Sequence, residues 1–266
     1  MFDIPIYIAA GAILGFLIGL TGIGAGVLTV PFLILVMRLD PVEAVGTTSL
    51  YAVFTKSYAL FRHYKQKTIN FKRGFRFLLI TAPGVLLASS LVKWSKVTLP
   101  PEGVETLQSC ISYVIIVSIG FSIIAMSIDY RKLDNTFFSS PIGKILKVIC
   151  IFFIGIIIGA TSIGGGILII PALLFFYRET TRYVGTAILI AVMCMIVMSS
   201  IYALVGGNSS TPEVNFNIAA FMSMGSLFST HYGSALCKKI DPRRLQFVII
   251  AITVVAITML LYDKFN

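Results

Sequence analysis

The fold is decided by the stretch GLTGIGAGVLTVP at residues 19–31, which occurs twice in the chain. It returns 140 residues later as GATSIGGGILIIP, residues 159–171. Extended by two residues, the copies align over 15 positions without a gap, and 8 positions are identical. Each copy places a glycine turn inside apolar sequence, and irregular backbone at membrane depth is tolerated only when it is buried in protein or faces a wet cavity. We therefore interpret the two copies as paired halves of one site.

The composition is that of an integral membrane protein. Of the 266 residues, 57% are hydrophobic and 12% are charged, whereas soluble domains have about 45–50% apolar and about 25% charged residues. Apolar stretches of about 17 to 22 residues recur along the chain, as membrane-spanning helices require. The net charge of +10 lies mostly in loops without interleaved aromatic residues. We therefore expect membrane lipid, and no nucleic acid, as a partner.

We expect an all-α integral membrane fold built from two inverted repeats of about five apolar segments each. The first repeat covers residues 1–130, a linker covers 131–141, and the second repeat covers 142–266. The apolar segments are expected at 4–21, 27–37, 42–61, 76–92 and 107–128, and again at 142–160, 167–177, 183–205, 216–237 and 245–262. The glycine turns at 22–26 and 161–166 would form broken or re-entrant helix hairpins that meet near the midplane.

The distribution of positive charge predicts the orientation in the membrane. If each glycine hairpin returns to the side it left, one side receives 16 of the 21 Lys and Arg residues and the other receives 4. If the hairpins do not return, the two sides receive 11 and 9 Lys and Arg residues. The positive-inside rule favours the more uneven distribution, which is the one with returning hairpins. We therefore expect a multi-pass protein of the cell (cytoplasmic) membrane with both termini outside. The basic loops 62–76, 131–147 and 238–244 would then face the cytoplasm.

The residue types of the two turns favour an anionic substrate. Glycines permit tight turns and leave backbone N–H groups bare at helix N-termini, where an anion is stabilised. No Asp or Glu lies in the middle of an apolar segment, although a cation site would normally need one. The alternative is that these glycines only pack helices. The predicted substrate-binding residues are Thr21, Gly22, Gly24, Gly26, Pro31, Gly46, Thr47, Thr48, Thr161, Ser162, Gly164, Gly165, Gly166, Pro171, Gly185 and Thr186.

Two further polar residues lie inside apolar segments. Lys56 and His231 are candidates for coupling or anion contact. Lys56 is close enough to Arg62 to extend its ammonium to the cytoplasmic surface instead, and His231 could be a hydrogen-bonded packing residue. The four cysteines have neither metal-binding spacing nor the pattern of a disulfide framework, so we expect no metal and no cofactor.

The doubled motif resembles the sulfite exporter TauE/SafE family, also called the four-toluene sulfonate uptake permease family. The resemblance rests on Gly-x-x-Gly-x-Gly-x-Gly followed by Pro and then by Val-Gly-Thr about 15 residues on, and it covers nearly the whole chain. It implies a permease for small sulfur-containing anions (sulfite, sulfonates, sulfoacetate, thiosulfate) that is driven by the proton gradient. The half-sites are not equivalent, because Gly22 and Ala25 stand where the second copy has Ser162 and Gly165.

The leading hypothesis is therefore an alternating-access transporter that is not an enzyme, with a homodimer as a possible assembly. An anion channel or another organic-anion permease is the nearest alternative. A Ser162–His231 dyad would suit an intramembrane enzyme, but Ser162 corresponds to Gly22 in the first copy. A scaffold subunit would have no use for paired turns at the midplane.

Overall fold

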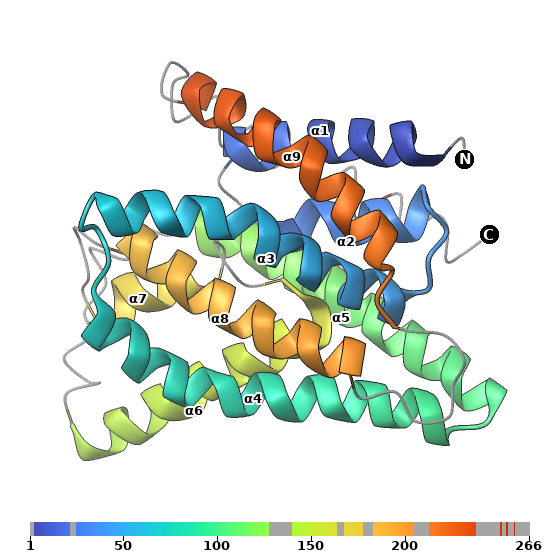
Figure 1. Cartoon of the computed structure of the whole chain (residues 1–266). Coiled ribbons are helices and arrows are strands. Elements are labelled where there is room, and N and C mark those ends of the chain that lie inside the picture. The colour runs from blue at the N-terminus through green and yellow to red at the C-terminus, as the bar shows by residue number, and fades with distance from the viewer. Residues whose placement is uncertain are drawn as a thin grey trace.

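The computed structural model describes residues 3–21, 25–127, 140–163, 168–177, 183–204 and 213–237, together with Ala251, Val254 and Thr258. Regular secondary structure in these ranges is helical (Figure 1). The helices are α1 (Asp3–Thr21), α2 (Ala25–Leu35), α3 (Pro41–Lys65), α4 (Phe71–Thr98), α5 (Pro101–Ser127), α6 (Pro141–Thr161), α7 (Ile169–Tyr177), α8 (Tyr183–Leu204) and α9 (Phe216–Cys237). They correspond in order to the first nine predicted apolar segments. The predicted tenth segment and most of the linker lie outside the described residues.

Polar residues fix where several helices begin. The side chain of Asp40 accepts a hydrogen bond from the backbone N–H of Glu43 at 2.9 Å, and Pro41 follows it. Asn70 and Ser140 cap α4 and α6 in the same way. Such residues satisfy backbone N–H groups that have no partner within the helix. The cap at Asn70 explains why α4 begins several residues before the predicted apolar segment.

The helix lengths are those of a multi-pass membrane protein with broken elements. Helices α4, α6 and residues 183–203 of α8 are long and apolar enough to cross a bilayer. By contrast, α2 has 11 residues and α7 has 9. At 1.5 Å per residue these two reach about 16 Å and about 14 Å, roughly half of a hydrocarbon core of about 30 Å. The two helices that follow the glycine turns therefore cannot cross a bilayer by themselves.

Two closely packed helix pairs flank a central pair. In Figure 1, α1 and α9 lie together at the top, α4 and α6 lie together at the bottom, and α3 and α8 run between them. Small residues permit the close approach. A Cβ added at Gly15 would lie 2.5 Å from the Cα of Ser226 in α9, and one at Gly155 would overlap the carbonyl oxygen of Thr81 in α4. Such small-residue interfaces are typical of membrane helices.

Many outward-facing side chains are large and apolar. Phe228, Ile142, Val117 and Trp94 are each at least 65% exposed. A soluble protein would keep so many large apolar groups away from water, but a lipid-facing surface has no such constraint. The polar and charged residues described below instead occupy the interior and the two ends of the helices.

Candidate functional site

The structure brings the two copies of the glycine-rich sequence into contact. Gly26 lies in the first turn of α2, and Ser162 is the C-cap of α6. A Cβ at Gly26 would overlap the carbonyl oxygen of Ser162 and would lie 3.0 Å from the Cα of Ile163. Glycine at position 26 therefore allows the two backbones to touch. All three residues are buried. We call this contact the turn junction.

Ser162 has a conformation that explains the residue type at its position. Its backbone is left-handed, with φ 58° and ψ 9°, a region that glycine adopts at least cost. The equivalent residue of the first copy is Gly22. The Ser162 N–H donates to the Ile158 carbonyl at 2.8 Å, and its hydroxyl lies 3.5 Å from the sulfur of Met195.

Thr161 also uses its hydroxyl within the protein. The Thr161 hydroxyl donates to the Ile157 carbonyl at 2.6 Å and accepts the Ile163 N–H at 3.2 Å. In this conformation, therefore, neither Thr161 nor Ser162 holds its hydroxyl free. Of the other predicted residues near the turns, Pro31 is buried inside α2 and Pro171 lies at the start of α7. The predicted residues Gly22, Gly24, Gly164, Gly165 and Gly166, and the side chain of Thr21, lie outside the described part.

The predicted pairs Gly46-Thr47 and Gly185-Thr186 each contact a segment from the opposite half of the sequence. The Thr47 hydroxyl accepts a hydrogen bond from the N–H of Asn215 at 3.0 Å, and the Thr186 hydroxyl accepts one from Asn70 at 2.9 Å. Asn215 and Asn70 directly precede α9 and α4. Both threonines are fully buried. Their hydroxyls therefore hold the starts of two helices in place.

The glycine of each pair allows the same segment to approach closely. A Cβ at Gly46 would overlap the carbonyl oxygen of Glu213, and one at Gly185 would overlap that of Thr68. Glu213 and Thr68 each lie two residues before the asparagine that the neighbouring threonine binds. The sequence predicted these pairs as substrate donors, whereas the structure gives them a visible role in joining segments.

Lys56 and His231, the two predicted intramembrane candidates, are more exposed than the residues of the turn junction. Lys56 is partly exposed in the second half of α3. His231 lies on an exposed part of α9, with its ring centroid 5.9 Å from that of Tyr232. The structure thus places His231 at the surface of the helical bundle, while Thr47, Thr48 and Ser162 lie in its interior.

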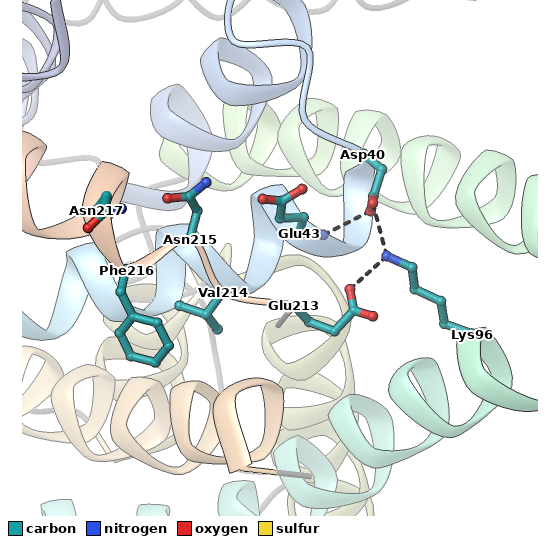
Figure 2. Close-up of a pocket in the computed structure, with 8 residues that line it drawn as sticks. All are labelled: Asp40, Glu43, Lys96, Glu213, Val214, Asn215, Phe216 and Asn217. Carbon is teal, nitrogen blue, oxygen red and sulfur yellow. Dashed lines mark hydrogen bonds and ion pairs between the residues drawn. The ribbon is translucent and has the colours of Figure 1, made fainter. Parts of the chain in front are cut away.

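A polar pocket of about 420 Å³ lies where α3 and α9 begin and α4 ends. Figure 2 shows Lys96 reaching between two carboxylates. Its ammonium lies 2.9 Å from an oxygen of Asp40 and 2.6 Å from an oxygen of Glu213. Glu213 is 6% exposed, so this ion pair compensates a carboxylate that is largely removed from water. The pocket is lined by Asp40, Glu43, Lys96, Glu213, Val214, Asn215, Phe216 and Asn217.

Lys93, one turn before Lys96, ties the same end of α4 to α8. Its ammonium donates to the carbonyl oxygens of Ile201 at 3.2 Å and Tyr202 at 2.7 Å. These carbonyls belong to the last turn of α8, where backbone acceptors lack helical partners and a cation is favourable. Lys93 is 3% exposed. Lys93 and Lys96 therefore connect one end of α4 to α8, α3 and the segment entering α9.

The opposite end of α4 has a different chemistry. Arg73 donates to the carbonyl oxygen of Tyr177 at 3.2 Å. Lys147 donates to that of Phe176 at 2.9 Å, and its ammonium lies 3.6 Å from the centroid of the Tyr177 ring. Arg73 and Lys96 are separated by about 35 Å along the helix at 1.5 Å per residue. The end of the bundle at the start of α4 therefore carries basic groups next to the last residues of α7. The end where α4 finishes carries the three carboxylates of the pocket together with Lys96.

The ion-pair pocket was not predicted from the sequence. Lys96 and Glu213 are 117 residues apart, and single charged residues near helix ends look like ordinary interfacial residues. The pair Asn70-Phe71 recurs 145 residues later as Asn215-Phe216. This repeat was a usable signal, because it marked two equivalent helix starts. Within the described residues, no group of three or more His, Cys, Asp or Glu side chains is arranged to hold a metal ion.

Comparisons with known proteins agree on the class of membrane transporters. The family model described as "Sulfite exporter TauE/SafE" matches residues 7–260. The probable membrane transporter protein YjnA of Bacillus subtilis (strain 168) is 29% identical over 252 residues, covering 94% of this chain and 96% of the relative. The probable membrane transporter protein MJ0441 of Methanocaldococcus jannaschii is 28% identical over 264 residues, covering 94% and 92%. No solved structure matches the chain.

Proposed function

The chain belongs to the sulfite exporter TauE/SafE family and is a membrane transporter, and from this we propose a specific activity. It moves small sulfur-containing anions, of the sulfite, sulfonate, sulfoacetate and thiosulfate class, across the cytoplasmic membrane. Transport proceeds by alternating access and is coupled to the proton gradient. The anion binds at the turn junction.

The observation that carries this proposal is the contact between Gly26 and Ser162. It joins the N-terminal turn of α2 to the C-cap of α6 in the buried interior. Bare N–H groups at a helix N-terminus favour an anion. The carboxylates of the polar pocket lie where α3 and α9 begin, and neither Gly26 nor Ser162 lines that pocket.

Reciprocal contacts support an inverted repeat of residues 1–130 and 142–266. The bond from Asn215 to Thr47 has its counterpart in the bond from Asn70 to Thr186. The motifs containing these residues align at offsets of 145 and 139. A two-fold relation between the halves would produce this exchange of partners, and inverted repeats with broken helices at the midplane are a common transporter design. Rocking of one part against another would then open the junction to either side.

The charges at the two ends support an orientation. Basic groups such as Arg73 and Lys147 gather at the end of α7, and the positive-inside rule assigns that end to the cytoplasm. The pocket around Lys96 then faces the outside, together with both termini. In the conformation described, the Lys96 ion pairs hold that outer end together, and outward opening requires them to separate.

The test is a flux panel with purified protein in proteoliposomes. Sulfite, sulfate, thiosulfate, taurine, sulfoacetate and simple carboxylates are each offered with and without an imposed pH gradient. Saturable flux of a sulfur anion, raised by the gradient, supports the proposal. Saturable flux that is the same with and without the pH gradient would indicate an uncoupled pathway such as a channel. Flux of carboxylates alone would indicate another organic-anion permease and contradict the proposed substrate class.

A further inference from the structure

Lys56 is a cation inside helix α3 whose ammonium has no partner among the described residues. It makes neither a hydrogen bond nor an ion pair with any of them. Other lysines that are shielded from water are bonded: Lys93 donates to the Tyr202 carbonyl, Lys96 pairs with carboxylates, and Lys147 donates to a carbonyl of α7. Ionisable residues at membrane depth usually pair with another group or mark a substrate pathway. The unpartnered ammonium of Lys56 therefore needs an explanation.

The packing of α3 against α8 fixes the relative direction of the two helices. A Cβ added at Gly46, near the start of α3, would lie 3.2 Å from the Cβ of Tyr202, near the end of α8. One added at Gly185, near the start of α8, would lie 3.2 Å from Nδ1 of His63, near the end of α3. The two helices are therefore antiparallel, and Lys56 lies between these two points of contact.

The side chain of Lys56 extends from α3 toward α8. Ser49 and Ala52 precede it by seven and four residues, so the three side chains share one face of the helix. Ser49 and Ala52 are both fully buried. The ammonium of Lys56 is close enough to the thiol of Cys194 in α8 for an electrostatic interaction. Because Cys194 is also fully buried, this face of α3 belongs to the interface of the central helix pair.

The contact with Cys194 places Lys56 near the middle of the membrane. Helix α8 is long and apolar enough to cross a bilayer. Cys194 lies eleven residues after its first residue, Tyr183, and ten before its last, Leu204, which is about 15–16 Å from either end. Lys56 is nine residues, or about 14 Å, from the end of α3 at Lys65. Half of a hydrocarbon core is about 15 Å, so both helices indicate the same depth.

The turn junction lies at this depth as well. Met195 directly follows Cys194 in α8, and its sulfur lies 3.5 Å from the hydroxyl of Ser162. Ser162 is the residue whose carbonyl oxygen contacts Gly26. Lys56 and the turn junction therefore approach α8 at two consecutive residues. A lysine side chain has a flexible four-carbon stem, so the ammonium can move toward a ligand at the junction.

No described carboxylate lies at this depth to balance the charge of Lys56. In the part of the chain that the structure describes, each Asp and Glu lies within four residues of a helix start: Asp3, Asp40, Glu43, Glu102, Glu105 and Glu213. A charge that is removed from water is unfavourable unless an opposite charge is close to it. A negatively charged ligand at the turn junction would supply that charge.

We propose that the ammonium of Lys56 binds the transported anion at the turn junction and is its positive counter-charge. The ammonium donates a hydrogen bond to an oxygen atom of the anion, and it selects anions over neutral molecules and cations. This inference rests on the proposed transport function and adds a binding residue to the same site. The alternative is that the ammonium only extends to the cytoplasmic surface, in which case Lys56 has no role in binding.

The test compares stability with transport in Lys56→Met and Lys56→Arg. Methionine removes a charge that has no partner in the protein, so Lys56→Met should unfold at the wild-type temperature or above it. It should nevertheless raise the KM for methanesulfonate in proteoliposomes at least about tenfold, the usual loss for a hydrogen bond to a charged group. Lys56→Arg keeps the positive charge and should recover most of that loss.

Lys65→Met is the matched control, because it removes the same charge from the same helix. Lys65 is exposed at the end of α3, beside the ring of Phe61, and the KM of its variant should stay within about twofold of wild type. A second measurement is independent of transport. Methanesulfonate should raise the unfolding temperature of the wild type, Lys56→Arg and Lys65→Met in detergent, and it should leave that of Lys56→Met unchanged.

Three results for the variants would overturn the inference and leave the proposed function standing, provided that the wild type transports methanesulfonate. The first is a wild-type KM for Lys56→Met. The second is a KM for Lys56→Arg as high as that for Lys56→Met, because the positive charge would then not be what binds. The third is an equal rise of KM in Lys65→Met, which would assign the effect to surface charge. Absence of flux for every sulfur anion in the wild type would overturn both proposals.

Discussion

The hydroxyl oxygen of Thr47 accepts a hydrogen bond from the backbone N–H of Asn215 at 3.0 Å, across 168 residues of sequence. Asn215 directly precedes α9, and its own side chain caps that helix through the N–H of Ile218. One buried hydroxyl thus fixes the point at which a helix of the second half begins. The Thr186–Asn70 bond does the same for α4.

We predict that Thr47→Val destabilises the protein. The same change at Thr48 should not, because the buried Thr48 hydroxyl has no hydrogen-bond partner. The valine side chain leaves the Asn215 N–H without its acceptor, which costs about 1–3 kcal/mol. Thermal unfolding in detergent measures the difference, with Thr55→Val as the control, because the Thr55 hydroxyl donates within α3 to the Tyr51 carbonyl. Equal unfolding temperatures for the Thr47 and Thr48 variants would contradict this assignment of their hydroxyls.

A second prediction concerns the ion pairs of Lys96. Lys96→Met should destabilise the protein by about 3 kcal/mol, because it leaves Glu213 as a largely buried charge without its partner. Adding Glu213→Gln should recover much of that loss. A double-mutant cycle by thermal unfolding measures the coupling. Additive effects of the two substitutions would show that the ion pair contributes nothing beyond the individual side chains.

The packing of α6 on α4 gives a third prediction. In Gly155→Ala, the new Cβ would overlap the carbonyl oxygen of Thr81, so we expect a loss of about 1–3 kcal/mol from overpacking. Gly120 in α5 has no atom within 4 Å of the corresponding position. Gly120→Ala should therefore be neutral or slightly stabilising, since alanine is the better helix former. Unfolding temperatures that rank the two variants in reverse would contradict the described interface.

A fourth prediction tests the orientation. Gln66 and Glu102 are exposed residues near opposite ends of the bundle, one after α3 and one at the start of α5. In a background with all four cysteines replaced, an impermeant thiol reagent should label Glu102→Cys in intact cells. It should label Gln66→Cys only after permeabilisation. The reverse pattern would invert the proposed topology.

Within the described residues, the sequence was sufficient to predict the helices and their order, because long apolar segments need no long-range information. It also identified Gly26, Thr47 and Thr186 as special, because each lies in a motif that occurs twice. What each side chain does depended on partners far away in the chain. The sequence does not reveal that the Thr47 hydroxyl is occupied by Asn215 while its neighbour Thr48 has no partner, nor that Lys96 lies between Asp40 and Glu213.

The central claim is that the anion binds at the turn junction, and transport by Gly26→Val tests it most directly. A valine side chain would collide with the Ser162 carbonyl, so the junction must shift. We predict that the anion flux through folded, reconstituted Gly26→Val falls at least about tenfold, because the binding groups are misplaced. Gly120→Ala should keep the wild-type rate. Wild-type flux through Gly26→Val in the same proteoliposomes would contradict the claim.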